Sequence, residues 1–135
     1  MKLMDNYIDK TKVSKFERNE EDIAAILSVI QTYSDGGRCG DAQIMKTAFR
    51  ENATIHGYMG GSLLAGSINN LFDWVTENPP APDLEAKIDN VDFAKTIATA
   101  RVEITGWLGH RFTDQFTLLK ENGKWIITSK VFHAY

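Results

Sequence analysis

The sequence predicts an α+β domain in which N-terminal helices pack on one face of a curved antiparallel sheet. Two observations lead to this prediction. Apolar residues recur at three- and four-residue spacing in the first half of the chain, and long segments typical of strands fill the second half. A length of 135 residues fits one domain. We therefore expect a lead-in segment over residues 1–19 and a single domain over residues 20–135.

Composition and charge exclude several classes of protein. Hydrophobic residues make up 43% of the chain and charged residues 24%, as in ordinary globular proteins. A net charge of -3 argues against nucleic-acid binding, which needs a basic surface. No stretch reaches the ~20 apolar residues that span a bilayer, so no membrane partner is expected. Cys39 is the single cysteine and the N-terminal segment is polar throughout, which together favour a cytoplasmic location.

Two helices are expected before the first strand. The first starts at Glu20, because an acidic first turn is followed by an apolar stripe that includes Ile23, Ile30 and Tyr33. We expect Asp35-Gly36-Gly37 to end it. Asp41 then has the chemistry to cap a second helix, which Asn52 would end.

A short hairpin and a third helix follow. Residues 53–59 read as a strand, Gly60-Gly61 as a turn, and residues 62–65 as a second strand. Ser67 can cap a helix that buries Ile68, Leu71, Phe72 and Val75. The proline-rich segment 78–82 must end this helix, because proline cannot continue it.

The second half of the chain predicts a four-stranded meander. Its strands are expected over residues 85–93, 97–107, 111–120 and 124–133. The Asn122-Gly123 dipeptide between the last two is the strongest short hairpin motif in the sequence.

Hairpin geometry predicts which side chains face the helices. A three-residue loop at 108–110 would place Ile104 opposite Asp114 and Val102 opposite Phe116. The inner face would then carry Ala98, Ala100, Val102, Ile104, Phe112, Asp114, Phe116 and Leu118. Asp114 is the one charged residue in this set.

The last strand is expected to continue the same face without interruption. A two-residue turn at Asn122-Gly123 places Val131 beside Asp114 and His133 beside Phe112 on the inner face. By strand alternation Lys130 would point outward, where an ion pair at the surface is a better expectation than a Schiff-base lysine.

Several motifs resemble those of the nuclear transport factor 2-like superfamily. They are Tyr33-Ser34-Asp35-Gly36 with Gly40-Asp41, Ala48-Phe49 followed by Ala53-Thr54-Ile55, and the run from Asp114 to Lys120 that continues through Asn122-Gly123-Lys124-Trp125 to Ser129-Lys130-Val131-Phe132. The resemblance covers residues 20–133 and is closest to the branch called putative lumazine-binding proteins. It implies a cystatin-like curved sheet wrapped around the N-terminal helices, forming a cone with an internal pocket. The superfamily includes ketosteroid isomerase and polyketide cyclases of the SnoaL type.

The resemblance also suggests three catalytic candidates. By rough placement His56 occupies the region where ketosteroid isomerase keeps its base, and an imidazole can relay protons near neutral pH. Tyr33 lies on the helix that supplies that enzyme's tyrosine, and Asp114 would be a third polar group from the sheet. Two of them have a plainer alternative: His56 on the solvent face of its strand, and Asp114 as a structural acid bonded to Tyr33, a helix terminus or water.

Aromatic and sulfur-containing side chains are expected to line the pocket and to accept a small hydrophobic or aromatic molecule. The expected pocket residues are Phe49, Met59, Phe72, Trp74, Phe112, Phe116 and His133. No cofactor and no metal is expected, because His56, His110 and His133 lack the spacing of metal ligands.

The outer face of the sheet mixes polar and apolar residues, which predicts a homodimer through this face with Trp107 and Phe132 as anchors. The function expected is that of a small-molecule-binding protein, with cofactor-free isomerase, dehydratase or cyclase chemistry on a hydrophobic substrate. A non-catalytic ligand carrier or a dimerisation module is the alternative.

Overall fold

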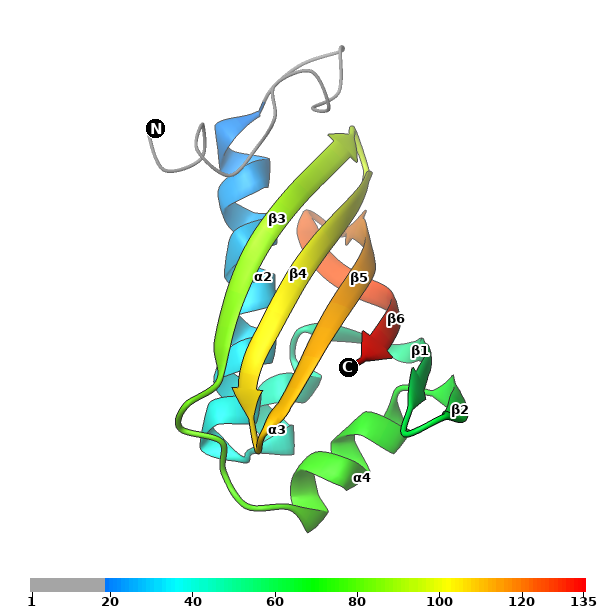
Figure 1. Ribbon diagram of the computed structural model, residues 1–135. Coiled ribbons are helices and arrows are strands. Elements are labelled where there is room, and N and C mark those ends of the chain that lie inside the picture. Colours follow the sequence, from blue (N-terminus) through cyan, green and yellow to red (C-terminus); the bar gives the residue numbers. More distant parts are fainter. Residues whose placement is uncertain (1–18) are drawn as a thin grey trace.

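The computed structural model describes residues 19–135 and confirms the predicted fold class. Long helix α2 (Glu20–Cys39) runs along one face of a curved sheet whose strands cross in front of it in Figure 1. The expected lead-in segment over residues 1–19 lies, apart from Asn19, outside the described residues. Within the described part of the chain, no helix is long and apolar enough to cross a membrane.

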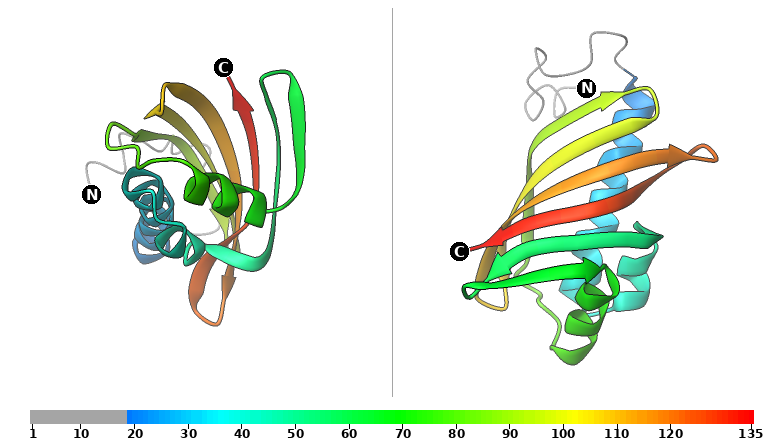
Figure 2. Two further views of the ribbon diagram at one scale, coloured as in Figure 1. Left: turned by 90° about the horizontal axis from the view of Figure 1, so that it is seen from below. Right: turned by 90° about the vertical axis from the view of Figure 1, so that its right-hand side faces the viewer.

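The sheet has six strands in the order β2-β1-β6-β5-β4-β3. Their bounds are β1 Phe49–Met59, β2 Ser62–Ser67, β3 Glu85–Ala94, β4 Ile97–Trp107, β5 His110–Glu121 and β6 Lys124–Ala134. Every neighbouring pair is antiparallel except β1 and β6, which run parallel. The views in Figure 2 show this sheet curving around the helices, with its two edge strands well apart.

Helix α2 continues past the glycines that were expected to stop it. Gly36 and Gly37 are buried, and a Cβ added at Gly36 would lie 2.6 Å from the Met45 Cβ. These glycines therefore permit close packing inside the helix instead of ending it. The helix ends at Gly40, whose φ of 62° is the left-handed conformation that glycine adopts without strain.

The expected cap of the second helix is confirmed, but its expected end at Asn52 is wrong. The Asp41 carboxylate accepts hydrogen bonds from the backbone amides of Gln43 and Ile44 at the start of α3 (Ala42–Lys46). The helix has only five residues, because Phe49 already pairs with Ile127 of β6.

Helix α4 (Asn69–Glu77) begins beyond Ser67, which is the last residue of β2. The Ser67 hydroxyl accepts a hydrogen bond from the Asn69 amide at 3.1 Å. The helix lies across the end of the sheet formed by β1 and β2, below them in Figure 1. Its buried residues are Leu71, Phe72 and Val75.

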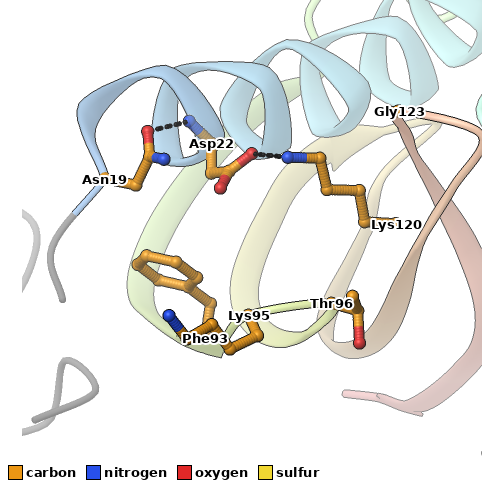
Figure 3. A pocket seen from close by; sticks show the side chains of 7 residues that line it. All are labelled: Asn19, Asp22, Phe93, Lys95, Thr96, Lys120 and Gly123. Atoms are coloured by element: carbon orange, nitrogen blue, oxygen red, sulfur yellow. Dashed lines mark hydrogen bonds and ion pairs between the residues drawn. The ribbon is translucent and has the colours of Figure 1, made fainter. Parts of the chain in front are cut away.

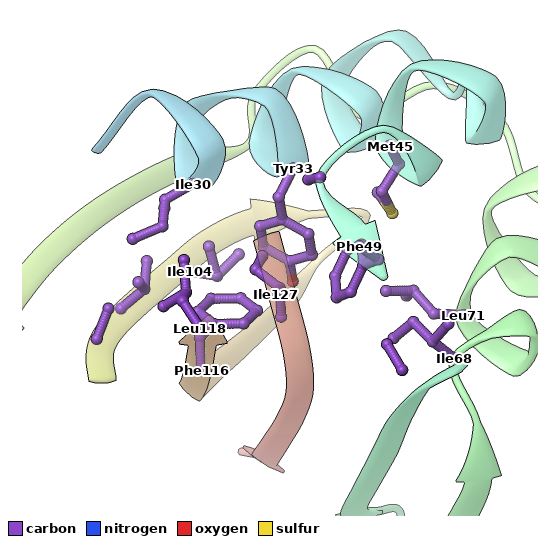
Figure 4. Packing of buried hydrophobic residues seen from close by; sticks show 14 of the residues in the cluster. Ile30, Tyr33, Met45, Phe49, Ile68, Leu71, Ile104, Phe116, Leu118 and Ile127 are labelled. Carbon is purple, nitrogen blue, oxygen red and sulfur yellow. The ribbon is translucent and has the colours of Figure 1, made fainter. Parts of the chain in front are cut away.

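A single core fills the space between the helices and the concave face of the sheet. Figure 4 shows side chains from α2, α3 and α4 pointing toward the strands. The inner face predicted for β4 and β5 is confirmed, since all eight of its side chains are buried. The predicted pairing is two residues out of register, because Val102, not Ile104, lies opposite Asp114.

The register differs because the hairpin between β4 and β5 has a different loop. Trp107 pairs with His110 across a two-residue turn, and the pairing is irregular between Ile104 and Trp107. Gly106 in this irregular segment has a φ of 71°. The irregularity turns Trp107 inward, so its expected place as an anchor on the outer face is wrong.

A β-bulge in β6 overturns the prediction for the last strand. The Asn122-Gly123 turn is as predicted, with Glu121 paired to Lys124, but pairing then jumps from Leu118↔Ile127 to Thr117↔Ser129. One extra residue, Thr128, therefore lies in β6, and every later residue of the strand changes face. Lys130 and Phe132 turn inward, while Val131 and His133 turn outward.

Candidate functional site

The bulge in β6 places a lysine inside the molecule. Lys130 is only 3% exposed and Asp114, on the neighbouring strand, is 0% exposed. The Lys130 Nζ lies 3.7 Å from the Asp114 Oδ1, which has no hydrogen-bond partner among the described residues. Because lysine is almost never fully buried without a partner, this pair is the most unusual polar feature of the described chain.

Tyr33 completes the polar group from the helix side. Its hydroxyl donates a hydrogen bond of 2.7 Å to the second oxygen of Asp114, Oδ2. Figure 4 shows the Tyr33 side chain reaching from α2 toward the sheet. Lys130, Asp114 and Tyr33 thus form one connected group, which we call the buried triad, drawn from β6, β5 and α2.

Burial shifts the proton affinities of all three members. Burial lowers the pKa of the Lys130 amine from its ordinary value, and the Asp114 charge opposes this shift. Burial raises the pKa of the Asp114 carboxyl, with Lys130 and Tyr33 acting in the opposite direction. Burial also raises the pKa of Tyr33, with Asp114 adding to the effect. The pKa values of the amine and the carboxyl therefore move toward each other.

Four aromatic rings surround the lysine nitrogen. The Nζ atom lies 5.1 Å from the ring centre of Tyr33, 5.2 Å from Phe132, 5.7 Å from Trp107 and 5.9 Å from Phe112. Each ring face attracts a cation. The site can therefore hold a positive charge at this nitrogen without water around it.

Lys130 also forms part of the wall of a cavity of about 160 Å³, which we call the Lys130 cavity. The other residues that line it are Ile55, Met59, Leu64, Asn70, Leu71, Trp74, Trp107, Phe112 and Phe132. Lys130 and Asn70 are the only polar side chains in this lining. Apart from these two side chains the cavity is apolar, which is typical of a site for a small, mostly hydrophobic molecule.

The expected pocket residues divide between this cavity and the core. Met59, Trp74 and Phe112 line the Lys130 cavity. Phe49, Phe72 and Phe116 are buried in the core next to it and do not line it. His133 lies on the opposite face of the sheet, because of the bulge at Thr128.

The structure brings two of the three catalytic candidates together. Tyr33 and Asp114 are hydrogen-bonded. His56 is exposed, paired with Ala65 of β2 and Val131 of β6, so the expectation that it faces the pocket is wrong. Its neighbour Ile55 takes the inward position, because successive strand residues alternate between faces.

Sequence reasoning missed Lys130, although one feature pointed to it. A buried carboxylate on β5 needs a counter-charge, and Lys130 is the cation of the adjacent strand nearest to Asp114 in the predicted pairing.

A second and larger hollow lies at the other end of the molecule, around Asp22 (Figure 3). Its charged groups already have partners. The Asp22 Oδ1 accepts hydrogen bonds from Lys120 at 2.8 Å and from the Trp125 indole at 3.0 Å. Among residues 19–135, no group of three His, Cys, Asp or Glu side chains could hold a metal ion. The Lys130 cavity is therefore the stronger candidate.

Comparisons with known proteins agree with the fold. Residues 21–133 match the family described as "Putative lumazine-binding". The chain is 30% identical over 112 residues to the aldolase FrzH of Cladobotryum sp, an alignment that covers 82% of this chain and 90% of that protein.

Solved structures give the same result. An NTF2-like protein of unknown function from Methylobacillus flagellatus KT is 40% identical, with a TM-score of 0.85 over 88% of this chain and 96% of that one. A similar protein from Shewanella baltica OS155 is 37% identical, with a TM-score of 0.83 over 88% of this chain and 98% of that one. A ketosteroid isomerase-like protein from Erwinia carotovora atroseptica, 15% identical with a TM-score of 0.65 over 86% of this chain and 98% of that one, shares the fold. This chain therefore belongs to the putative lumazine-binding family of the nuclear transport factor 2-like superfamily.

Proposed function

We propose that this protein binds a small, hydrophobic carbonyl compound in the Lys130 cavity and catalyses proton transfer at the carbon next to the carbonyl. The observation that carries the proposal is the buried Lys130 amine at the wall of an otherwise apolar cavity. Removing a proton from the carbon next to the carbonyl leaves negative charge on the carbonyl oxygen. A cationic donor fixed in a site without water stabilises such a charge far better than water does.

The proposal assigns a role to each member of the buried triad. The Lys130 amine, neutral while Asp114 holds its proton, takes the proton from the carbon next to the carbonyl, and the ammonium so formed donates a hydrogen bond to the enolate oxygen. Asp114 holds the amine in place and exchanges a proton with it, and Tyr33 fixes the carboxylate through its 2.7 Å hydrogen bond. Tyr33 is thus a positioning residue. Tyr33 and Asp114 were expected to donate hydrogen bonds to a developing oxyanion; here they support Lys130, which takes that role and also replaces His56.

Enolate formation is common to isomerisation and to aldol reactions, in which the enolate adds to a second carbonyl carbon. The 30% identity to a protein named as an aldolase supports the aldol reaction over dehydration or cyclisation. A carbon–carbon bond would then form or break in the cavity, with the proton transfers made by the triad.

Exchange of carbon-bound hydrogen for deuterium tests this proposal. Butanal and cyclohexanone, both small enough for the cavity, are incubated with protein in heavy water, and loss of the proton next to the carbonyl is followed by NMR. We expect catalysed exchange by the wild type and its loss in Lys130→Met. The matched control, Lys124→Met, removes an exposed lysine from the same strand and should exchange as the wild type does. Equal rates in both variants would contradict the proposal.

The same samples distinguish an enzyme from a ligand carrier. Trp74 and Trp107 both line the cavity, so ligand entry should change the fluorescence of the protein. If a ligand changes the fluorescence but its hydrogen is not exchanged, the protein binds the ligand without catalysing a reaction. The ligand-carrier alternative would then replace the enzyme proposal.

We also propose that two copies of the chain associate through the outer face of the sheet. Phe132 faces inward, so the anchors differ from those first expected; Tyr58, Val131 and Tyr135 are 54%, 48% and 60% exposed there. Light scattering after size exclusion should give the mass of a dimer, and Val131→Lys should reduce it to that of a monomer. A monomeric wild type would contradict this proposal. The cytoplasmic location likewise stays a prediction.

A further inference from the structure

We infer that Lys130 is a covalent nucleophile, which forms an imine with the carbonyl carbon of an aldehyde bound in the Lys130 cavity. The inference rests on the proposed function and extends it from a carbonyl-binding amine to a covalent one. Three features of the structure carry it: the position of the amine, its partner carboxyl and the rings around it.

The position of the amine satisfies the first requirement for attack. Lys130 is 3% exposed, yet its side chain forms part of the cavity wall. A ligand that fills this apolar space displaces water from beside the amine. Water hydrolyses imines, so its exclusion favours their accumulation.

Asp114 meets the second requirement, which is proton transfer. The amine must lose a proton before its lone pair can attack, and the oxygen of the adduct must gain protons before it leaves. The Asp114 Oδ1 lies 3.7 Å from Nζ and has no hydrogen-bond partner among residues 19–135, so it can take a proton from the amine and return it. The Tyr33 hydroxyl occupies only the other oxygen, Oδ2.

The aromatic rings meet the third requirement, because the imine formed is a cation. Four ring centres lie within 6 Å of Nζ, at distances from 5.1 to 5.9 Å. A protonated imine keeps its positive charge at this nitrogen after the ammonium protons have gone. The rings that surround the ammonium therefore also stabilise the product of the covalent step.

The covalent step needs no reactant besides the Lys130 amine and the aldehyde. The lone pair of the neutral amine attacks the carbonyl carbon, a carbon–nitrogen bond forms, and the carbonyl π electrons move to oxygen, which takes a proton. The attacking nitrogen loses one proton to the Asp114 carboxylate, and the hydroxyl of the resulting carbinolamine leaves with that proton as water, giving the protonated imine. Loss of a proton from the neighbouring carbon gives an enamine, and addition of water later restores the amine and the carbonyl compound.

Reductive trapping tests the inference. Wild-type protein is incubated at pH 7 with butanal and sodium cyanoborohydride, digested, and mapped by mass spectrometry. The cavity holds the aldehyde next to the Lys130 amine, whereas Lys124 is exposed and meets it only by free collision. We therefore expect the butyl adduct on Lys130 to exceed that on Lys124 by about tenfold or more. Comparable labelling of the two lysines would overturn the inference.

Two further arms separate this inference from the proposed function. Lys130→Arg keeps the charge but cannot form an imine, and circular dichroism checks that it folds. If the wild type catalyses deuterium exchange but gains no adduct at Lys130, the covalent step is refuted and the proposed function stands. If Lys130 gains the adduct while exchange is absent, the nucleophile is upheld and the proposed function fails.

Discussion

The most sharply defined perturbation of the buried triad is Tyr33→Phe, because it removes one oxygen atom and keeps the ring. The ring packs edge-on against Phe49, Trp107 and Phe116 at centroid distances of 5.0 to 5.9 Å, and these contacts survive the substitution. The loss is therefore confined to the 2.7 Å hydrogen bond to Asp114, between two side chains that are each 0% exposed.

The size of the effect follows from this geometry. A hydrogen bond to a charged group contributes about 1.5–3 kcal/mol, and water cannot reach Asp114 to replace it. We expect the free energy of unfolding to fall by about 1.5–3 kcal/mol, roughly a 10- to 150-fold change in the unfolding equilibrium. Urea denaturation at pH 7, followed by tryptophan fluorescence, measures it.

Two controls make this result interpretable. Lys124→Met changes an exposed residue of β6 and should stay within about 0.5 kcal/mol of the wild type. In an Asp114→Asn background the loss caused by Tyr33→Phe should shrink, because the charged acceptor is gone. A loss below about 0.5 kcal/mol for Tyr33→Phe in the wild-type background would refute the reasoning.

Three further predictions concern charge and packing. The partners of Asp22 lower its pKa below the ordinary value of 3.8, so its contribution to stability is complete above that pH and is lost as pH falls through the lowered value. In urea titrations Asp22→Asn should therefore have a lower free energy of unfolding than the wild type at pH 6, and the difference should narrow toward pH 2. The Asp114 charge raises the pKa of Lys130, so Asp114→Asn should move the pH dependence of reductive trapping to lower pH, and a shift to higher pH would contradict this. Gly36→Ala gains about 1 kcal/mol of helix propensity, but its Cβ would lie 2.9 Å from the Met45 backbone, a clash that costs about 1–3 kcal/mol. The variant should therefore be less stable than the wild type in thermal denaturation.

Local patterns predicted most of the fold. The apolar stripe of α2, the Asp41 cap, the proline-rich exit from α4 and the Asn122-Gly123 turn all act over a few residues, and the structure has each of them. The two glycines in α2 were misread because close packing against α3 and β4 is a property of the tertiary structure. Nothing within the helix sequence distinguishes a glycine that stops a helix from one that admits a neighbour.

The candidate site was harder to predict, because two irregularities in strands decide which side chains face the cavity. The one near Gly106 contains a glycine with positive φ, which sequence reasoning can look for. The bulge at Thr128 contains no glycine and leaves two equally plausible alternations, one with Val131 inside and one with Lys130 inside. Uninterrupted alternation from the Asn122-Gly123 turn predicts the first, and the extra residue at Thr128 produces the second, with Lys130 beside the buried Asp114.

The proposed chemistry depends on a buried Lys130 amine beside Asp114 at the wall of the Lys130 cavity. A pH titration of the ¹⁵N-labelled side-chain amines by NMR, with the Lys130 resonance assigned from Lys130→Arg, measures this directly. We predict a midpoint below the ordinary lysine value of 10.5, and a shift of this resonance when butanal is added. A Lys130 resonance that titrates with those of the exposed lysines and does not respond to butanal would contradict the proposed chemistry.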